Sequence, residues 1–136
     1  MIAEEFVQYL TDLATAMESA SVEGPLRVCL PVLHEGFERN FMRAEDEAGV
    51  AWPPHAPRTI REMGEHPLLI WHGDLIEGAR DTGSPGNITV IGERDLETGV
   101  SGSSVPYAAT HQLGEGHIPQ RQYLYASEEV IDECTQ

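Results

Sequence analysis

The feature that most constrains the fold is a segment near the end of the chain, residues 105–124, which reads VPYAATHQLGEGHIPQRQYL. Residues 107–113 can form about two helical turns, and Gly114 and Gly116 are placed to end them. Pro119 has no amide hydrogen and disfavours a helical conformation in the residue before it. The sequence therefore predicts a short helix followed by an extended return.

Two functions are compatible with such a helix and return. One is an enzyme site that uses His111, His117 and Arg121. The other is a structural corner that orders a surface for binding or assembly. The choice between them depends on the rest of the chain.

The charge of the chain argues against one class of partner. The 136 residues, taken as one domain over residues 1–136, carry a net charge of −15 and no lysine. A chain so acidic repels phosphate groups, so no specific nucleic-acid binding is expected. The acidic residues are spread along the chain, which favours a solvated surface. An acidic, lysine-free composition suits a protein that functions in high salt, where charge repulsion is screened. A GC-rich genome, which favours arginine over lysine, would also explain the lack of lysine.

Two apolar stripes predict long N-terminal helices. The first helix spans residues 2–21, and its stripe consists of Ile2, Phe6, Leu10, Leu13 and Met17. Core packing is expected of this stripe. The second helix spans residues 26–48, with one face formed by Leu26, Leu30, Leu33, Phe37 and Phe41. Pro31 is expected to kink this helix or to set its start.

The middle of the chain predicts a loop and short elements. Residues 49–57 contain three prolines, and within this loop Trp52 is expected to plug the edge of the core. A capping box that begins at Thr59 predicts a short helix ending at Met63. Residues 67–71 are the most apolar stretch and predict a short buried segment.

The remaining residues predict a small sheet. Residues 79–82 and 88–92 are expected to pair as a hairpin. The polar residues 93–104 are expected to form a mobile loop that becomes ordered on assembly. Residues 122–126 alternate as a final strand, and Ser127 is expected to cap a C-terminal helix. The predicted fold class is α+β, with N-terminal helices packed on a small, mostly antiparallel β-sheet and a short C-terminal helix.

The sequence contains no convincing catalytic, cofactor or metal motif. Its six histidines lack the spacing of a zinc site; they are His34, His55, His66, His72, His111 and His117. No nucleophile elbow and no phosphate-binding loop occur. The two cysteines, Cys29 and Cys134, could pair but are expected to be free thiols. No membrane span and no signal peptide are expected.

Four motifs, taken in order, resemble a known family. A W-P loop leads into a helix at residues 52–60, an apolar segment ends in a G-x-L turn at residues 68–75, and a strand reads ITVIG at residues 88–92. The most specific motif is YAATHQLG followed by IPQRQYL, at residues 107–114 and 118–124. Together they resemble the phage virion morphogenesis or tail-completion proteins, which are related to small head–tail joining neck proteins. The chain departs from that family at Trp71 and His72, where a threonine is usual.

The resemblance implies a non-enzymatic structural protein of the virion neck or upper tail, which completes the tail and joins it to the head. Assembly would take place in the host cytoplasm. The implied assembly is a homo-oligomeric ring, expected to be a hexamer, through which genome DNA could pass. Its implied partners are connector or adaptor proteins on one side and tail-tube or tail-terminator proteins on the other.

Two alternatives remain beside this interpretation. Within the same class, the chain could be a tail terminator or a minor head-assembly protein. From another class, it could be a small metal-dependent hydrolase that uses His111 and Arg121.

The structural interpretation assigns a role to each residue of the C-terminal corner. Tyr107 and Tyr123 are expected in the core, and His111 and Gln112 are expected to hydrogen-bond the backbone of the glycine turn at Gly114–Gly116. Arg121 is expected to form an ion pair within the subunit or with its neighbour. The candidate assembly residues are Trp52, Tyr107, His111, Gln112, Gly114, Pro119, Arg121 and Tyr123.

Overall fold

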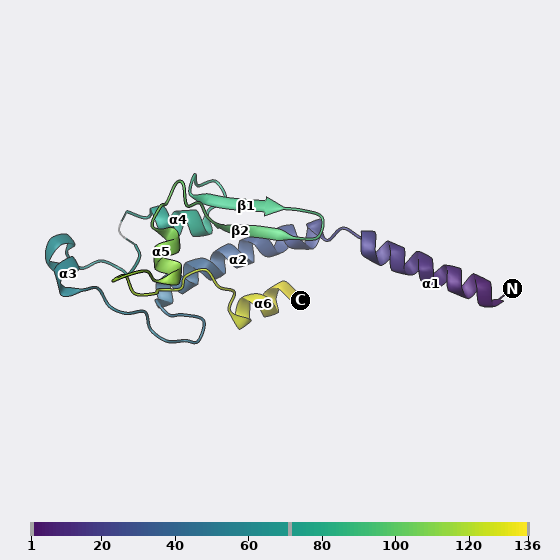
Figure 1. Ribbon diagram of the computed structural model, residues 1–136, viewed down its shortest axis with the longest axis horizontal. Helices are drawn as coiled ribbons and strands as arrows, with labels where there is room; N and C mark the ends of the chain where they lie inside the picture. The colour runs from purple at the N-terminus through teal and green to yellow at the C-terminus, as the bar shows by residue number, and fades with distance from the viewer. Residues whose placement is uncertain (1, 71, 136) are drawn as a thin grey trace.

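The computed structural model describes residues 2–70 and 72–135, and in these residues the chain has an α+β fold (Figure 1). Trp71, the last residue of the apolar segment, lies outside the described residues. The elements in order are α1 Ile2–Ser19, α2 Glu23–Arg43, α3 Pro57–Met63, α4 Asp74–Arg80, β1 Asn87–Ile91, β2 Leu96–Val100, α5 Ala108–Leu113 and α6 Glu128–Thr135.

Helix α2 is the element on which the body is built. It contacts α4, α6 and strand β1, and the residues that it buries are His34, Gly36, Phe37, Asn40 and Phe41. The helix runs over Glu23–Arg43, so it begins three residues before the predicted helix 26–48 and ends five residues before it. Pro31 lies inside it and does not set its start. The helix ends at Ala44, which adopts a left-handed conformation with φ 51°.

Three aromatic rings form the centre of the core. Phe41 meets Trp52 edge-on at a centroid distance of 6.0 Å and lies 5.3 Å from Tyr123. Trp52 and Tyr123 are 5% and 1% exposed, so the expectation that both are core residues is confirmed. Helix α4 adds the buried side chains of Leu75 and Ile76 to this cluster. Aromatic pairs in such contact add about 0.5–1.5 kcal/mol beyond the area that they bury.

The sheet is an antiparallel hairpin. The strand predicted at residues 88–92 is present as β1, but its partner follows it in the chain and is not the predicted segment 79–82. Strand β1 pairs with β2, with Asn87 opposite Val100 and Ile91 opposite Leu96. Residues 79–82 are not a strand, since helix α4 extends to Arg80. The mobile loop expected over residues 93–104 is also wrong, because β2 lies within it. Apolar residues at both ends of the LETGV sequence make β2 a half-buried strand.

Residues 122–126 are extended but form no strand with the described residues. Side-chain amides replace a neighbouring strand. Gln112 Oε1 accepts hydrogen bonds from the backbone N–H groups of Tyr123 and Leu124, and its Nε2 donates to the Leu124 carbonyl. Asn40 Nδ2 donates to the carbonyls of Tyr123 and Tyr125. The alternating pattern correctly predicted an extended chain. The prediction that this segment is a strand of the sheet is wrong.

The N-termini of two short helices, α3 and α6, test the predicted caps. Helix α3 has Ala56 as its N-cap and Pro57 at its first position, and no side-chain cap bond is formed, so the predicted capping box at Thr59 is wrong. Pro57 fits there because the first helical N–H has no partner to lose. In α6 the prediction is confirmed, since Ser127 Oγ accepts a hydrogen bond from Val130 N.

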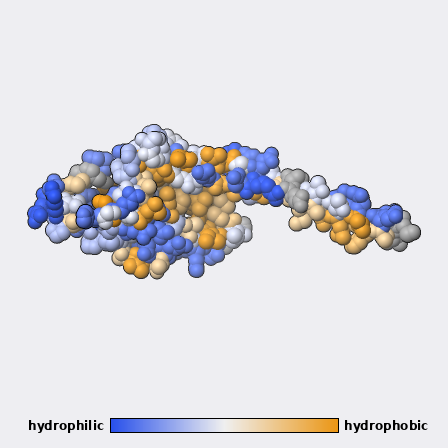
Figure 2. Space-filling model, viewed as in Figure 1, coloured by the Kyte–Doolittle hydropathy of each residue, from blue (hydrophilic) through white to orange (hydrophobic). Residues whose placement is uncertain are grey.

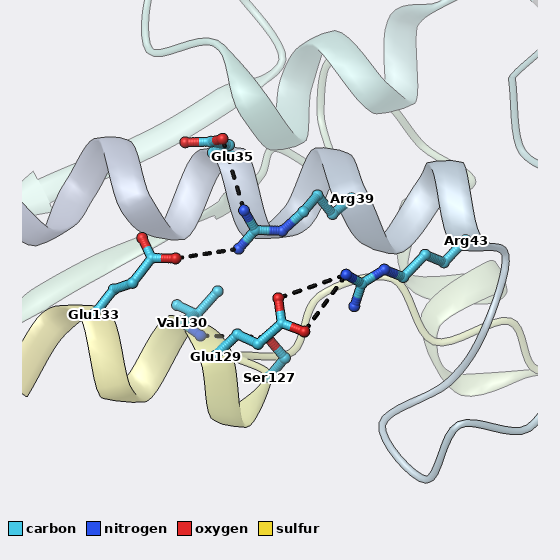
Figure 3. Close-up of polar contacts among 7 residues, drawn as sticks. All are labelled: Glu35, Arg39, Arg43, Ser127, Glu129, Val130 and Glu133. Atoms are coloured by element: carbon cyan, nitrogen blue, oxygen red, sulfur yellow. Dashed lines mark hydrogen bonds and ion pairs between the residues drawn. The ribbon is translucent and has the colours of Figure 1, made fainter.

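Helix α6 lies beside α2, and ion pairs join the two helices (Figure 3). Val130 is 1% exposed and lies over Gly36, where any Cβ atom would overlap its side chain. Ion pairs flank this contact, with Arg43 3.5 Å from Glu129. Exposed pairs of this kind contribute little to stability. Both cysteines are free, and Cys29 Sγ lies 3.6 Å from the Cys134 carbonyl oxygen.

Helix α1 does not pack in the core, which contradicts the expectation for its apolar stripe. It projects from the body as a separate arm (Figure 1), and apolar side chains gather along one side of it (Figure 2). The exposed fractions are 58% for Phe6, 46% for Leu10, 43% for Leu13 and 66% for Met17. At its base, Val22 N donates to the Glu93 carbonyl at 2.6 Å. Among the described helices, none is long and apolar enough to cross a membrane.

Candidate functional site

A cavity of about 500 Å³ lies between α3, α5, the start of α4 and the return after α5. Its apolar walls include Met63, Leu69, Ile70 and Ile118. Five of the six histidines line it, although they are scattered in the sequence: His55, His66, His72, His111 and His117. Arg121 also lines the cavity, so both histidines and the arginine of the candidate enzyme site do meet there.

Helix α5 and the return that follows it form one wall of the cavity. The helix ends at Gly114, as predicted, with φ 73°. A Cβ at Gly114 would approach Gln120 N to 2.8 Å, so the return can pass only beside a glycine. Arg121 N donates to the His111 carbonyl at 2.8 Å, and Tyr123 Oη donates to the Ala108 carbonyl at 2.6 Å. The corner is therefore rigidly tied to its own helix.

Arg121 holds two distant segments of the chain together. Its side chain is buried, with 7% exposed. Nε donates to the Pro53 carbonyl at 2.8 Å and Nη2 to the Pro54 carbonyl at 2.9 Å. No ion pair to Arg121 occurs among residues 2–70 and 72–135, so the expected ion pair is wrong within the subunit. Burial without a carboxylate lowers the pKa of Arg121.

The W-P loop meets the same corner through Trp52. Trp52 Nε1 donates to the Gln122 carbonyl at 3.0 Å, one residue beyond Arg121. The loop and the return are thus joined by three hydrogen bonds in which a side chain donates to a backbone carbonyl. Pro119 lines the cavity at the start of the return. These two motifs were predicted separately, and the structure brings them together.

His111 and Tyr107 differ from their expected roles. Tyr107 is 45% exposed and lies at the mouth of the cavity instead of in the core. Its ring meets the His111 ring edge-on at 5.8 Å. His111 Nδ1 is buried and has no hydrogen-bond partner in the described part of the chain, so it does not bind the glycine turn. Gln112 binds Tyr123 and Leu124 instead of that turn. Burial, and then the charge of Arg121, lower the pKa of His111.

Two further histidines, which the sequence did not single out, stack at the cavity wall. The rings of His55 and His66 lie 4.3 Å apart. His55 Nε2 contacts the His66 carbonyl at 3.1 Å, and His66 Nδ1 contacts the Gly64 carbonyl at 3.1 Å. A carbonyl accepts a hydrogen bond, so both nitrogens carry hydrogen and are unavailable as metal ligands. Their position follows from the turn at Gly64, which no helical or strand pattern reveals.

The arrangement is suited to binding. Within residues 2–70 and 72–135, no three histidine, cysteine or acidic side chains are placed to hold a metal ion. The donors Nε and Nη2 of Arg121 are engaged by the backbone. What remains is a cavity whose wall combines apolar side chains with polar ones, five of them histidines. Binding pockets commonly combine apolar walls with polar groups that orient the bound partner.

Comparison with known proteins does not assign a family. No family model, no curated protein and no solved structure matches the chain.

Replacing Arg121 with lysine tests whether its two-carbonyl contact holds the corner. Lysine keeps the charge but cannot direct two fixed donors at Pro53 and Pro54. We predict that Arg121→Lys lowers the free energy of unfolding in urea by about 2 kcal/mol. The exposed Arg61→Lys on α3 is the control and should stay within about 0.5 kcal/mol of wild type. Equal stability of the two variants would contradict the role given to Arg121.

The lowered pKa of His111 predicts a pH dependence of stability. The unfolded chain binds a proton here near pH 6.5, whereas the folded chain binds it only at lower pH. The stability linked to this residue is therefore complete above that pH and falls as the pH drops below it. We predict that wild type loses more unfolding free energy than His111→Gln between about pH 7.5 and about pH 5.5. An identical loss in both proteins would show that His111 keeps an ordinary pKa.

Proposed function

We propose that this chain is a structural virion protein of the neck or upper tail, which completes the tail and joins it to the head. It acts as the subunit of a homo-oligomeric ring, a hexamer that follows the six-fold axis of the tail. Connector or adaptor proteins bind one side, and tail-tube or tail-terminator proteins bind the other. The function depends on complementary surfaces and includes no chemical step.

The observation that carries this proposal is the exposed apolar face of α1. The face contains Phe6, Leu10, Leu13 and Met17, each at least 43% exposed. Most of the stability of a protein helix comes from packing its apolar face, and α1 has no such packing within the described residues. Burying each of these side chains against a partner would contribute about 1.5–3 kcal/mol. A helix of this kind is the expected form of an element that finds its packing partner in another subunit.

The corner supports the same proposal. Arg121 and Trp52 donate hydrogen bonds to backbone carbonyls and so fix the shape of the loop and return. Arg121 and Trp52 therefore stabilise the surface formed by the W-P loop and the return after α5. The hydrolase alternative, in which His111 and Arg121 act on a substrate, would have to release the Arg121 donors from Pro53 and Pro54.

The net charge bears on how the ring would form and work. Subunits of charge −15 repel one another, and about 1 M salt would shorten the range of that repulsion to about 3 Å. The contact between subunits must therefore be supplied by apolar burial. An acidic ring would also let DNA pass without binding to its phosphates.

A charge on the apolar face of α1 tests the proposal. We predict that wild type forms oligomers, and that Leu10→Asp weakens association at least about 10-fold, because a buried leucine is lost and a carboxylate must be desolvated. Light scattering coupled to size-exclusion chromatography, over a range of protein concentrations and salt, measures the mass.

Thr11→Asp is the matched control. It adds the same charge on the polar face of α1, at an exposed residue with no charged side chain three or four positions away. It should assemble as wild type does. Wild-type protein that stays monomeric at every concentration and salt would contradict the proposed function, and so would a Leu10→Asp variant that assembles normally.

A further inference from the structure

The exposed helix and the cavity lie at opposite ends of the molecule. In Figure 1, α1 extends from one end of the body, whereas α3 and α5, which line the cavity, lie toward the other. No single subunit can therefore place its own α1 in its own cavity. A helix of 18 residues is about 27 Å long, which is enough to reach across a boundary between two subunits.

The cavity has enough volume, and enough apolar lining, to accept a few side chains of a helix face. A volume of about 500 Å³ falls within the range of pockets that enclose a drug-sized ligand. This volume fits a few side chains and not a whole helix. The apolar walls are supplied by Met63, Leu69, Ile70 and Ile118. The side chains that enter must then come from one or two turns of a helix.

The charges of the cavity contrast with those of the chain as a whole. The chain has 23 acidic residues and a net charge of −15. Of the described residues that line the cavity, only Asp74 is acidic, and it is exposed. Arg121 is buried there without a carboxylate among residues 2–70 and 72–135, and His111 Nδ1 has no partner in that same part. An incoming carboxylate would meet the charge of Arg121 without strong repulsion.

Helix α1 offers the complementary chemistry. Its first turn carries Glu4 and Glu5, and Phe6 and Leu10 follow on one face, one helical turn apart. By helical geometry, Glu5 lies at the border of the apolar face, beside Phe6. One turn of α1 therefore presents two apolar side chains flanked by a carboxylate. The cavity presents apolar walls beside a buried guanidinium.

We propose that α1 of one subunit docks into this cavity of a second copy, head to tail, with Phe6 and Leu10 inserted and Glu5 on the side of Arg121. The proposal rests on the proposed function and names the partner surface of α1. Because different surfaces of the two copies meet, each docked pair leaves one helix and one cavity free for further subunits. Such contacts close into a ring if the rotation between subunits allows it, and otherwise extend as a filament.

The test uses two variants that each remove one side of the contact. Leu10→Asp disables the helix, and Thr59→Trp fills the cavity, since Thr59 lines it and is only half-buried. Ile60→Trp, on the same helix but outside the residues that line this cavity, is the control. Each protein is first checked for wild-type stability in urea. Size-exclusion chromatography with light scattering then gives the mass of each variant alone and of the mixture.

Head-to-tail docking predicts that both disabled variants are monomers alone, that Ile60→Trp assembles, and that an equimolar mixture of Leu10→Asp and Thr59→Trp forms a dimer and nothing larger. The dimer joins the intact helix of one variant to the intact cavity of the other. Assembly of Thr59→Trp as in wild type would overturn the docking site while leaving the proposed function standing. A mixture that stays monomeric would also overturn it. A monomeric wild type would overturn both proposals.

Discussion

Side-chain hydrogen bonds to the backbone of residues 121–125 are the contacts on which the rest of the body depends. Gln112 and Asn40 satisfy the N–H and carbonyl groups that a neighbouring strand would otherwise bind. Asn40 is 4% exposed, so losing these bonds would leave buried polar groups unpaired. Through them, the end of the chain is tied to α2 and α5 at once. The aromatic core and the cavity wall both follow from this attachment.

The fold class was predictable because helical periodicity and capping act locally. The stripe in α1, the end of α5 at Gly114 and the Ser127 cap of α6 all involve residues within a few positions of one another. The hairpin partner was not predictable in the same way, since residues 93–104 are rich in glycine and serine and conceal the short strand β2. Pairing in a sheet depends on partners distant in sequence, and a composition rule does not see them.

The sequence identified some residues of the candidate site but not the contacts that they make. The sequence identified Trp52 and Arg121 but could not show that they meet the same corner. Arg121 was expected to form an ion pair within the subunit or with its neighbour. The two prolines supply carbonyls at a fixed spacing instead. The stacked pair His55 and His66 was missed because its geometry depends on the turn at Gly64.

The apolar stripe of α1 shows that sequence periodicity predicts a helix but not the surface against which the helix packs. Its spacing predicted a helix, and the helix is present, but spacing does not say whether the partner surface belongs to the same chain. In this molecule the described body leaves that face exposed. The account therefore depends on α1 finding its partner in another subunit.

Hydrogen exchange of the α1 amides, measured over a range of protein concentrations, tests that claim most directly. A helix that projects alone should exchange rapidly in the dilute protein, because few contacts oppose its opening. The account predicts that protection of Ile2–Ser19 rises steeply with concentration, while protection of Glu23–Arg43 stays constant. Protection of α1 that is the same in dilute and concentrated protein would contradict it.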